Sequence, residues 1–161
     1  MKLKLTRIII FIIVILFCSG LLVGQDYMYW SGDFSTIVLS NIQTRDQAPE
    51  SSSSTTLYTS GNAEISADNT TTAQLSSATD TLATEYKLTF DGDGSSATGG
   101  TDTTYVTYDN FLTTAAGVTY VTDDNDVDVT LHVRASNYAG DLANAGTYTA
   151  TQTLTVHWVG P

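Results

Sequence analysis

The feature that most constrains the fold is a strict alternation near the end of the chain, GTYTATQTLTVHW at residues 146–158. Side chains of successive strand residues point to opposite faces, so this pattern predicts a long strand with one apolar face and one threonine face. A long β-rich strand must be paired or covered, because otherwise it templates association with other chains. The apolar parity consists of Tyr148, Ala150, Leu154, Val156 and Trp158.

Two further alternations, at residues 82–90 and 127–133, extend the same pattern. Short β-rich runs are separated by clusters of Gly, Asn, Asp and Ser, and helix-period apolar patterns are absent. Eight or nine short strands in one domain favour an all-β fold, namely an immunoglobulin-like two-sheet β-sandwich. A small closed barrel is the alternative.

Three segments carry more specific expectations. Residues 34–42 (FSTIVLSNI) read as the first strand, and we expect this strand to cover the terminal one, from the same chain or from a neighbour. Residues 43–56 read as a loop that contains the low-complexity run SSSS at 51–54. Residues 71–76 read as a weak strand.

The beginning of the chain has the composition of a secretory signal. Three basic residues lie in the first seven, residues 8–17 are uninterruptedly apolar, and small residues follow up to Gly24. We therefore expect residues 1–24 to form a signal helix that is cleaved, with an uncleaved anchor as the alternative. Residues 25–161 are the expected sandwich domain, secreted through the periplasm to the cell surface or the medium, with membrane contact only through the leader.

The charge balance excludes one class of partner. Beyond residue 24 the chain has three basic residues, Arg45, Lys87 and Arg134, against 17 acidic ones, which gives a net charge of −14. Nucleic-acid affinity depends on Lys and Arg, so we expect no nucleic-acid partner. The only cysteine, Cys18, lies in the leader, so the domain must be stabilised without a disulfide.

The best metal candidate is the glycine-rich stretch after residue 90. Asp91, Asp93 and Asp102 follow the spacing of an oxygen-ligand calcium loop. However, Ser96 stands where such a loop needs glycine, and no flanking helices are expected. A glycine-rich hairpin loop is therefore favoured, with calcium as the alternative and no cofactor expected. The acidic run at 123–128 reads as a solvated turn, with a cation site as the alternative. His132 and His157 read as exposed strand residues, with a shared metal site as the alternative if their strands are neighbours.

We do not expect an enzyme. A G-x-S-x-G nucleophile elbow is absent, and nothing in the sequence brings Glu50, Glu64 and Glu85 together as a glycosidase pair. Aromatic faces also bind sugars, so a carbohydrate site is an alternative to simple packing. The tyrosines concerned are Tyr58, Tyr105, Tyr108, Tyr120 and Tyr138.

Two blocks of the chain resemble spore coat protein U-type domains, which are similar to pilins of the archaic chaperone–usher class. Residues 63–90 match the middle of such domains, with the pair Thr81-Leu82 and then Tyr86 in a strand. Residues 127–158 match their end, a valine-rich strand, a loop and then AGTYT at 145–149 followed by the alternation. The chain departs from the family at Ala150, at Gln152 and in lacking a cysteine pair.

The resemblance implies a secreted structural subunit of a cell-surface coat or pilus-like fibre, assembled by strand exchange. Its partners would be copies of itself or related surface subunits, and a periplasmic chaperone in transit. The donor strand would come from residues 27–30 or 34–42. A self-contained surface binding module for carbohydrate or calcium is the alternative. The residues expected on the interaction strands are Phe34, Val38, Ile42, Tyr148, Leu154, Val156 and Trp158.

Overall fold

The computed structural model describes residues 26–91, 104–120, 126–138 and 141–160. Within these ranges it contains eight strands and one short 3₁₀ turn, η1. The elements are β1 (Met28–Trp30), β2 (Glu50–Thr59), β3 (Asn62–Ala67), η1 (Thr71–Ala73), β4 (Ala83–Asp91), β5 (Val106–Thr107), β6 (Ala116–Val118), β7 (Asp126–Ser136) and β8 (Leu154–Gly160).

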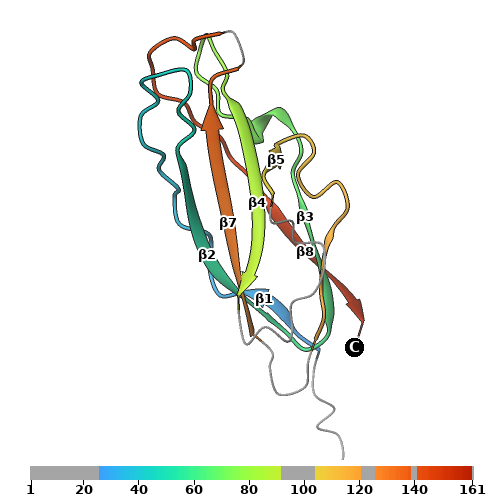
Figure 1. The fold of residues 1–161 in the computed structure, drawn as a ribbon. Coiled ribbons are helices and arrows are strands. Elements are labelled where there is room, and N and C mark those ends of the chain that lie inside the picture. Colours follow the sequence, from blue (N-terminus) through green and yellow to red (C-terminus); the bar gives the residue numbers. More distant parts are fainter. Residues whose placement is uncertain (1–25, 92–103, 121–125, 139–140, 161) are drawn as a thin grey trace, which may run out of the picture.

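The strands form two antiparallel sheets that pack face to face (Figure 1). The larger sheet has the order β1-β2-β7-β4-β5, and the smaller one has the order β6-β3-β8. The expectation of an all-β sandwich is therefore confirmed. The expected signal helix at residues 1–24 lies outside the described residues. No helix in the described part of the chain has both the length and the apolar character needed to cross a bilayer.

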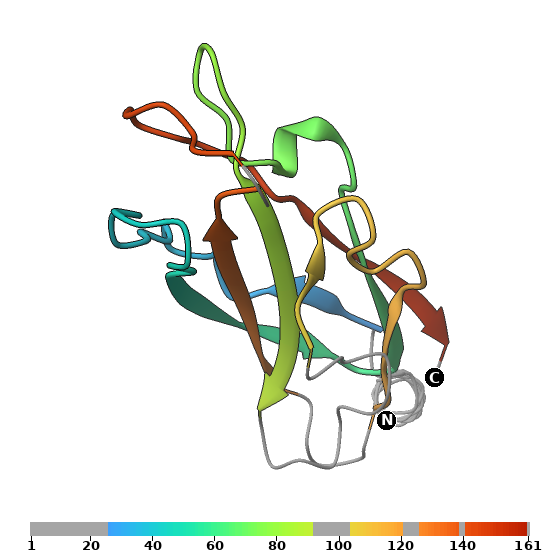
Figure 2. The same cartoon turned by 45° about the horizontal axis from the view of Figure 1, so that its top comes forward.

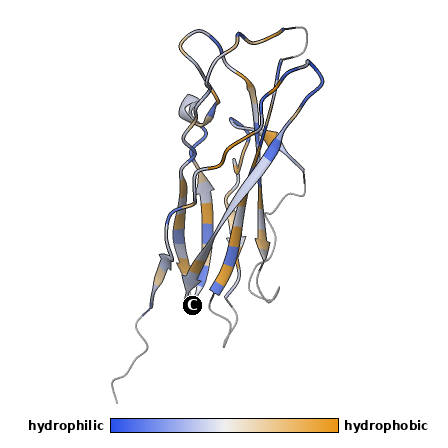
Figure 3. Ribbon diagram, turned by 90° about the vertical axis from the view of Figure 1, so that its left-hand side faces the viewer, coloured by the Kyte–Doolittle hydropathy of each residue, from blue (hydrophilic) through white to orange (hydrophobic). Residues whose placement is uncertain are grey.

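The core is built from the alternations seen in the sequence. Central strand β7 buries Val127, Val129, Leu131 and Val133, while its intervening residues face solvent. Strand β4 does the same with Thr84, Tyr86 and Leu88, and Leu82 just before it is also buried. Hydrophilic and hydrophobic residues accordingly alternate along the strands (Figure 3). The smaller sheet completes the core with Ala63, Ile65, Ala116 and Val118.

The serine run was wrongly assigned to a loop. Residues 51–54 belong to β2 and pair with residues 130–133 of β7. Ser51 and Ser53 turn partly inward, opposite Val133 and Leu131, whereas Ser52 and Ser54 are exposed. Pairing with a strongly β-forming neighbour overrides the weak strand preference of serine.

Residues 34–42 are a second correction, because they form no strand. Their half-buried apolar residues, Phe34, Ile37, Leu39 and Ile42, are spaced by three, two and three positions, which departs from the two-residue period of a ladder. Phe34, Ile37 and Leu39 nevertheless pack against the core.

Two shorter segments also differ from expectation. Residues 71–73 form η1, so the expected strand at 71–76 is reduced to an isolated bridge at Ser76. This turn interrupts the segment that faces residues 146–153. Those residues therefore form no continuous ladder and make only isolated contacts, such as Thr151 N donating to Thr72 O at 2.8 Å. The ladder of the terminal strand therefore begins only at Leu154.

Connecting loops gather at one end of the sandwich, as two views show (Figures 1 and 2). Asp80 accepts hydrogen bonds from the backbone N and side-chain Nδ2 of Asn144 at 2.8 and 2.7 Å. Gln74 Nε2 donates to the hydroxyl of Tyr138 at 2.6 Å. Strand β1 and the end of β8 lie at the opposite end (Figure 1).

Candidate functional site: the open edge of β8

Strand β8 is the outermost strand of the smaller sheet, and it pairs only with β3 among the described residues. The register fixes which of its main-chain groups are used. Asp68 N donates to Thr153 O at 2.9 Å, which places these two residues at a hydrogen-bonding position just beyond the end of the ladder. Hydrogen-bonded pairs recur every second residue in an antiparallel ladder, which makes Thr155 and His157 the next residues that bond to β3.

The residues between them therefore present their main-chain groups outward. In non-hydrogen-bonded pairs the N–H and C=O point away from the partner strand. Leu154, Val156 and Trp158 occupy such pairs, opposite Ala67, Ile65 and Ala63. The open edge of β8 thus offers a row of main-chain donors and acceptors to a further strand.

The side chains of the same three residues are only half-buried. Leu154, Val156 and Trp158 point toward the core but remain partly exposed, whereas Ile65 in the adjacent strand is fully buried. The apolar row of β8 is therefore covered on one flank only. An open main-chain edge and a half-buried apolar row therefore coincide on this strand.

The sandwich is also open between β8 and β1. A shallow hollow of about 280 Å³ is lined by Asp26, Tyr27, Met28 and Trp158, which come from the edges of both sheets. The indole of Trp158, one of these lining residues, packs on Gly61 in the turn between β2 and β3. The hollow marks the gap between the two sheets at this side.

The chain between β1 and β2 runs along the same side of the larger sheet, next to β2 (Figure 1). Ser35 N donates to Ser53 Oγ at 2.9 Å, and Thr55 Oγ1 donates to Gly32 O at 2.8 Å. The ring of Phe34 packs on that of Trp30 with centroids 5.8 Å apart. Within the described residues no backbone hydrogen bond joins 34–42 to β8. This apolar segment is held by side chains rather than by a ladder.

The residues expected on the interaction strands fall into two groups. Leu154, Val156 and Trp158 lie together on the open edge of β8. Val38, in contrast, points away from the protein and is 76% exposed, because its neighbours Ile37 and Leu39 take the inward positions. Tyr148 precedes the ladder and donates its hydroxyl to Asn144 O at 2.6 Å. Phe34 and Ile42 are half-buried in the chain that flanks β2.

Gln152 lies where the extended chain enters β8. Its Nε2 donates to the carbonyl oxygens of Asp68 and Thr153, both at 3.1 Å. Its Oε1 is buried and accepts no hydrogen bond from the described protein atoms. The amide nitrogen of Gln152 is thus hydrogen-bonded at the start of the edge strand, whereas its amide oxygen has no donor among the described protein atoms.

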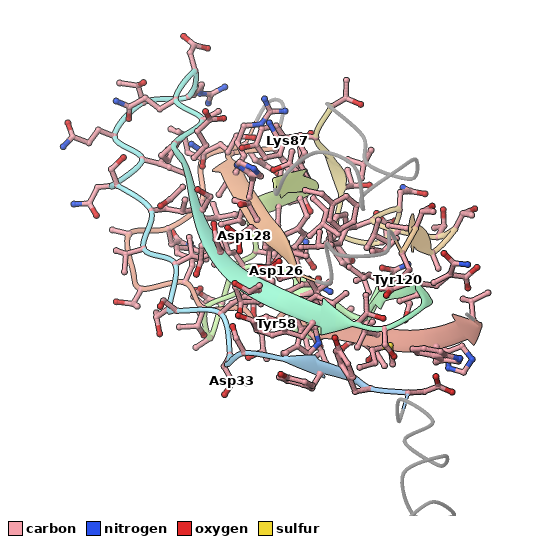
Figure 4. All side chains as sticks on the ribbon, turned by 90° about the horizontal axis from the view of Figure 1, so that it is seen from below. Asp33, Tyr58, Lys87, Tyr120, Asp126 and Asp128 are labelled. Carbon is pink, nitrogen blue, oxygen red and sulfur yellow. The ribbon has the colours of Figure 1, made fainter. Side chains whose placement is uncertain are left out.

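The metal candidates are only partly described. Asp91 ends β4, whereas Asp93 and Asp102 lie outside the described residues. In the described part of the chain no three His, Cys, Asp or Glu side chains gather in a way that would hold a metal ion. Asp126 and Asp128 are exposed on the outer face of the larger sheet, near Tyr58 (Figure 4), and Thr56 Oγ1 donates to Asp128 at 2.7 Å.

The two histidines lie on opposite outer faces of the sandwich. His132 is on the outer side of β7 and His157 on the outer side of β8, so they do not share a site. Partial burial, together with the nearby Lys87 cation, lowers the pKa of His132, and the Glu50 carboxylate opposes this shift. His132 Nε2 forms a hydrogen bond with the hydroxyl of Thr89 at 2.8 Å.

The sequence did not reveal a charged cluster on the outer face of the larger sheet. Arg134 forms an ion pair with Glu85 at 2.8 Å, and the ring of Tyr105 lies between Arg134 and Lys87, at 4.4 and 4.7 Å from its centroid. Burial and a hydrogen bond to Glu50 raise the pKa of Tyr105 to about 12. The alternating outward positions of β4 and β7 were the available signal, but only the strand pairing shows that they are neighbours.

The tyrosines of the carbohydrate alternative are dispersed rather than gathered. Tyr58 lies on the outer face of the larger sheet, Tyr105 in the charged cluster, Tyr108 against the core, and Tyr138 in the loops at the other end. Tyr120 follows β6, where its N–H donates to Asn62 Oδ1 at 2.9 Å.

Comparisons with models of protein families, with curated proteins and with solved structures find no match to this chain.

Proposed function

We propose that the chain is a secreted structural subunit of a cell-surface coat or pilus-like fibre, in which the open edge of β8 accepts a strand from a neighbouring subunit. The observation that carries the proposal is the coincidence on β8 of outward main-chain groups with a half-buried apolar row. Strand addition uses both features, because main-chain hydrogen bonds supply affinity and alternate side chains fill the gaps.

The order of the strands supports this assignment. An immunoglobulin-like sandwich places strands A, B, E and D in one sheet and C, F and G in the other. Here β1-β2-β7-β4 follows the order A-B-E-D, and β3-β8 follows C-F. The seventh strand, G, would lie beside β8, at the edge that is open among the described residues.

The donor is the N-terminal segment of the next subunit. Residues 34–42 are rich in apolar side chains and belong to no ladder, while β1 contributes only three residues to its own sheet. A chaperone that occupies the same edge during secretion would keep subunits apart until assembly. Completing the burial of one aliphatic side chain on β8 is worth up to about 1.5–3 kcal/mol.

The test is the substitution Val156→Pro in the full chain. The N–H of Val156 points away from β3, so proline removes a donor from the open edge and leaves the native ladder bonded. Thr107→Pro is the matched control on β5, at the edge of the other sheet. Tyr108 N donates to Thr84 O at 3.0 Å, so the N–H of Thr107 likewise faces outward.

Wild type and Thr107→Pro are expected to form SDS-resistant ladders, whereas Val156→Pro remains a folded monomer by circular dichroism. Ladders of equal length from all three proteins would refute the role of this edge. A wild-type protein that stays monomeric, and whose melting temperature rises with calcium or a polysaccharide, would favour the binding-module alternative.

A further inference from the structure

Two tyrosines are stacked on the solvent side of the larger sheet. Tyr29 in β1 lies directly opposite Tyr58 in β2. Their ring centroids are 5.3 Å apart, with 25° between the planes, and Tyr29 is 53% exposed. Tyr27 adds a third ring at 6.0 Å from Tyr29, but tilted by 48°.

We propose that Tyr29 and Tyr58 form a site of oxidative cross-linking, where a one-electron oxidant such as a peroxidase with hydrogen peroxide joins β1 to β2 through a dityrosine bond. This inference does not depend on the assembly proposed above. It rests on the stack, on its exposure and on the register that holds the two residues opposite each other.

The chemistry balances without any group from the protein besides the two phenols. Each tyrosine loses one electron and the proton of its hydroxyl, and the two phenoxyl radicals couple through ring carbons ortho to oxygen. The hydrogen on each coupled carbon then moves to the phenol oxygen, which restores both aromatic rings. Hydrogen peroxide accepts the two electrons and two protons and becomes two molecules of water.

Geometry singles out this pair. Holding two reactants in contact converts a bimolecular coupling into an intramolecular one, with a large gain in rate. Tyr138 is also exposed, at 45%, but it forms no ring contact in the described part of the chain. Tyr86 contacts a second ring, that of Phe111, which has no phenol and is buried. The only cysteine of the chain is Cys18, so residues 26–160 hold no thiol that competes for the oxidant.

The bond would change how firmly the N-terminal strand is held. Strand β1 has three residues, and its flanking bonds are Ser31 N to Thr56 O at 2.8 Å and Ser60 N to Tyr27 O at 3.0 Å. A covalent link between residues 29 and 58 closes a loop that contains the entire segment flanking β2. Such a loop restricts the unfolded chain and fixes β1 to its own subunit.

The experiment treats the purified full chain, at low concentration, with a peroxidase and hydrogen peroxide. The expected product is a monomer lighter by two hydrogen atoms, with a peptide containing Tyr29 joined to one containing Tyr58. Tyr29→Phe and Tyr58→Phe are expected to lose this product, and Tyr138→Phe to retain it. Oxidation of Met28 adds oxygen and is distinguished by mass.

Two further measurements make the test decisive. In urea the Tyr29–Tyr58 product should fall several-fold, because the fold supplies the proximity, and in the folded cross-linked protein the amide of Ser60 should exchange more slowly. A product that links Tyr27 to Tyr29 or joins two molecules, no cross-link under conditions that oxidise tyrosine, or an equal yield in urea would overturn the proposal.

Discussion

The indole of Trp158 lies directly on Gly61, so that a Cβ at residue 61 would stand 2.6 Å from the ring atom Cζ2 and 2.5 Å from Gly160 O. Gly61 lies in the tight connection between β2 and β3, where Thr59 Oγ1 donates to its carbonyl oxygen at 2.6 Å. The turn that joins the two sheets thus supports Trp158, the largest side chain on the open edge.

Gly61→Ala is therefore expected to destabilise the fold by about 1–3 kcal/mol, because either the indole or the turn must shift. Urea unfolding followed by tryptophan fluorescence measures the loss. Gly32→Ala is the control, since a Cβ there meets no atom within 4 Å. Equal stability of the two variants would mean that Trp158 moves aside freely.

The hydroxyl of Tyr86 is a second group whose removal should lower the stability of the fold. It is buried and donates to Ala73 O at 2.6 Å, which ties β4 to the η1 turn. Tyr86→Phe leaves that carbonyl without its partner, and we expect a loss of about 1–2 kcal/mol in thermal or urea unfolding. Tyr58→Phe, at a half-buried position on the outer face, should change stability by less than half as much.

The ion pair between Glu85 and Arg134 is expected to contribute modestly. Both side chains are partly exposed, and solvent screening limits such pairs to a coupling of about 0.5–1 kcal/mol. A double-mutant cycle with Glu85→Gln and Arg134→Met measures the coupling, which should shrink at high salt. The cycle of Glu64→Gln with Arg134→Met, which links residues in different sheets, should give no coupling.

Acid should weaken the fold through His132. Its pKa is lowered in the folded protein, so the unfolded chain binds more protons as the pH falls through its ordinary value near 6.5. Stability therefore decreases from pH 7 towards pH 5. His132→Gln should flatten this part of the pH profile of urea unfolding, and a slope unchanged by that substitution would contradict the assignment. His157→Gln on the other face is the matched control.

The parts of the fold that the sequence predicted are those with a strict period of two. The alternations at 82–90 and 127–133 correspond to β4 and β7, because each strand is flanked on both sides and turns one parity towards the core. The shared parity of Leu154, Val156 and Trp158 was also read from the sequence, but the strand at 34–42 that was expected to cover them does not form.

Tertiary context decided the remaining elements. Serines 51–54 carry no strand signal of their own and become β2 only by pairing with β7. Residues 34–42 carry a strong β composition but have an irregular apolar spacing and no ladder partner. The cluster of Tyr105, Lys87 and Arg134 forms only because β4 pairs with β7 and because the chain brings residue 105 back against the outer face of that sheet. Local sequence encodes neither of these long-range contacts.

The register of β8 has a consequence for what the edge can recognise. Outward main-chain groups recur at every second residue, and inward apolar side chains recur at the same residues. An added strand must therefore match this two-residue period in both its hydrogen bonds and its apolar side chains. A strand that joins one residue out of step turns its polar side chains into the gap and its apolar ones into water. Many different sequences have apolar residues at every second position, but a single inserted or deleted residue moves all later side chains of the added strand to the opposite face. Selectivity at this edge would therefore tolerate substitution far better than it tolerates insertion.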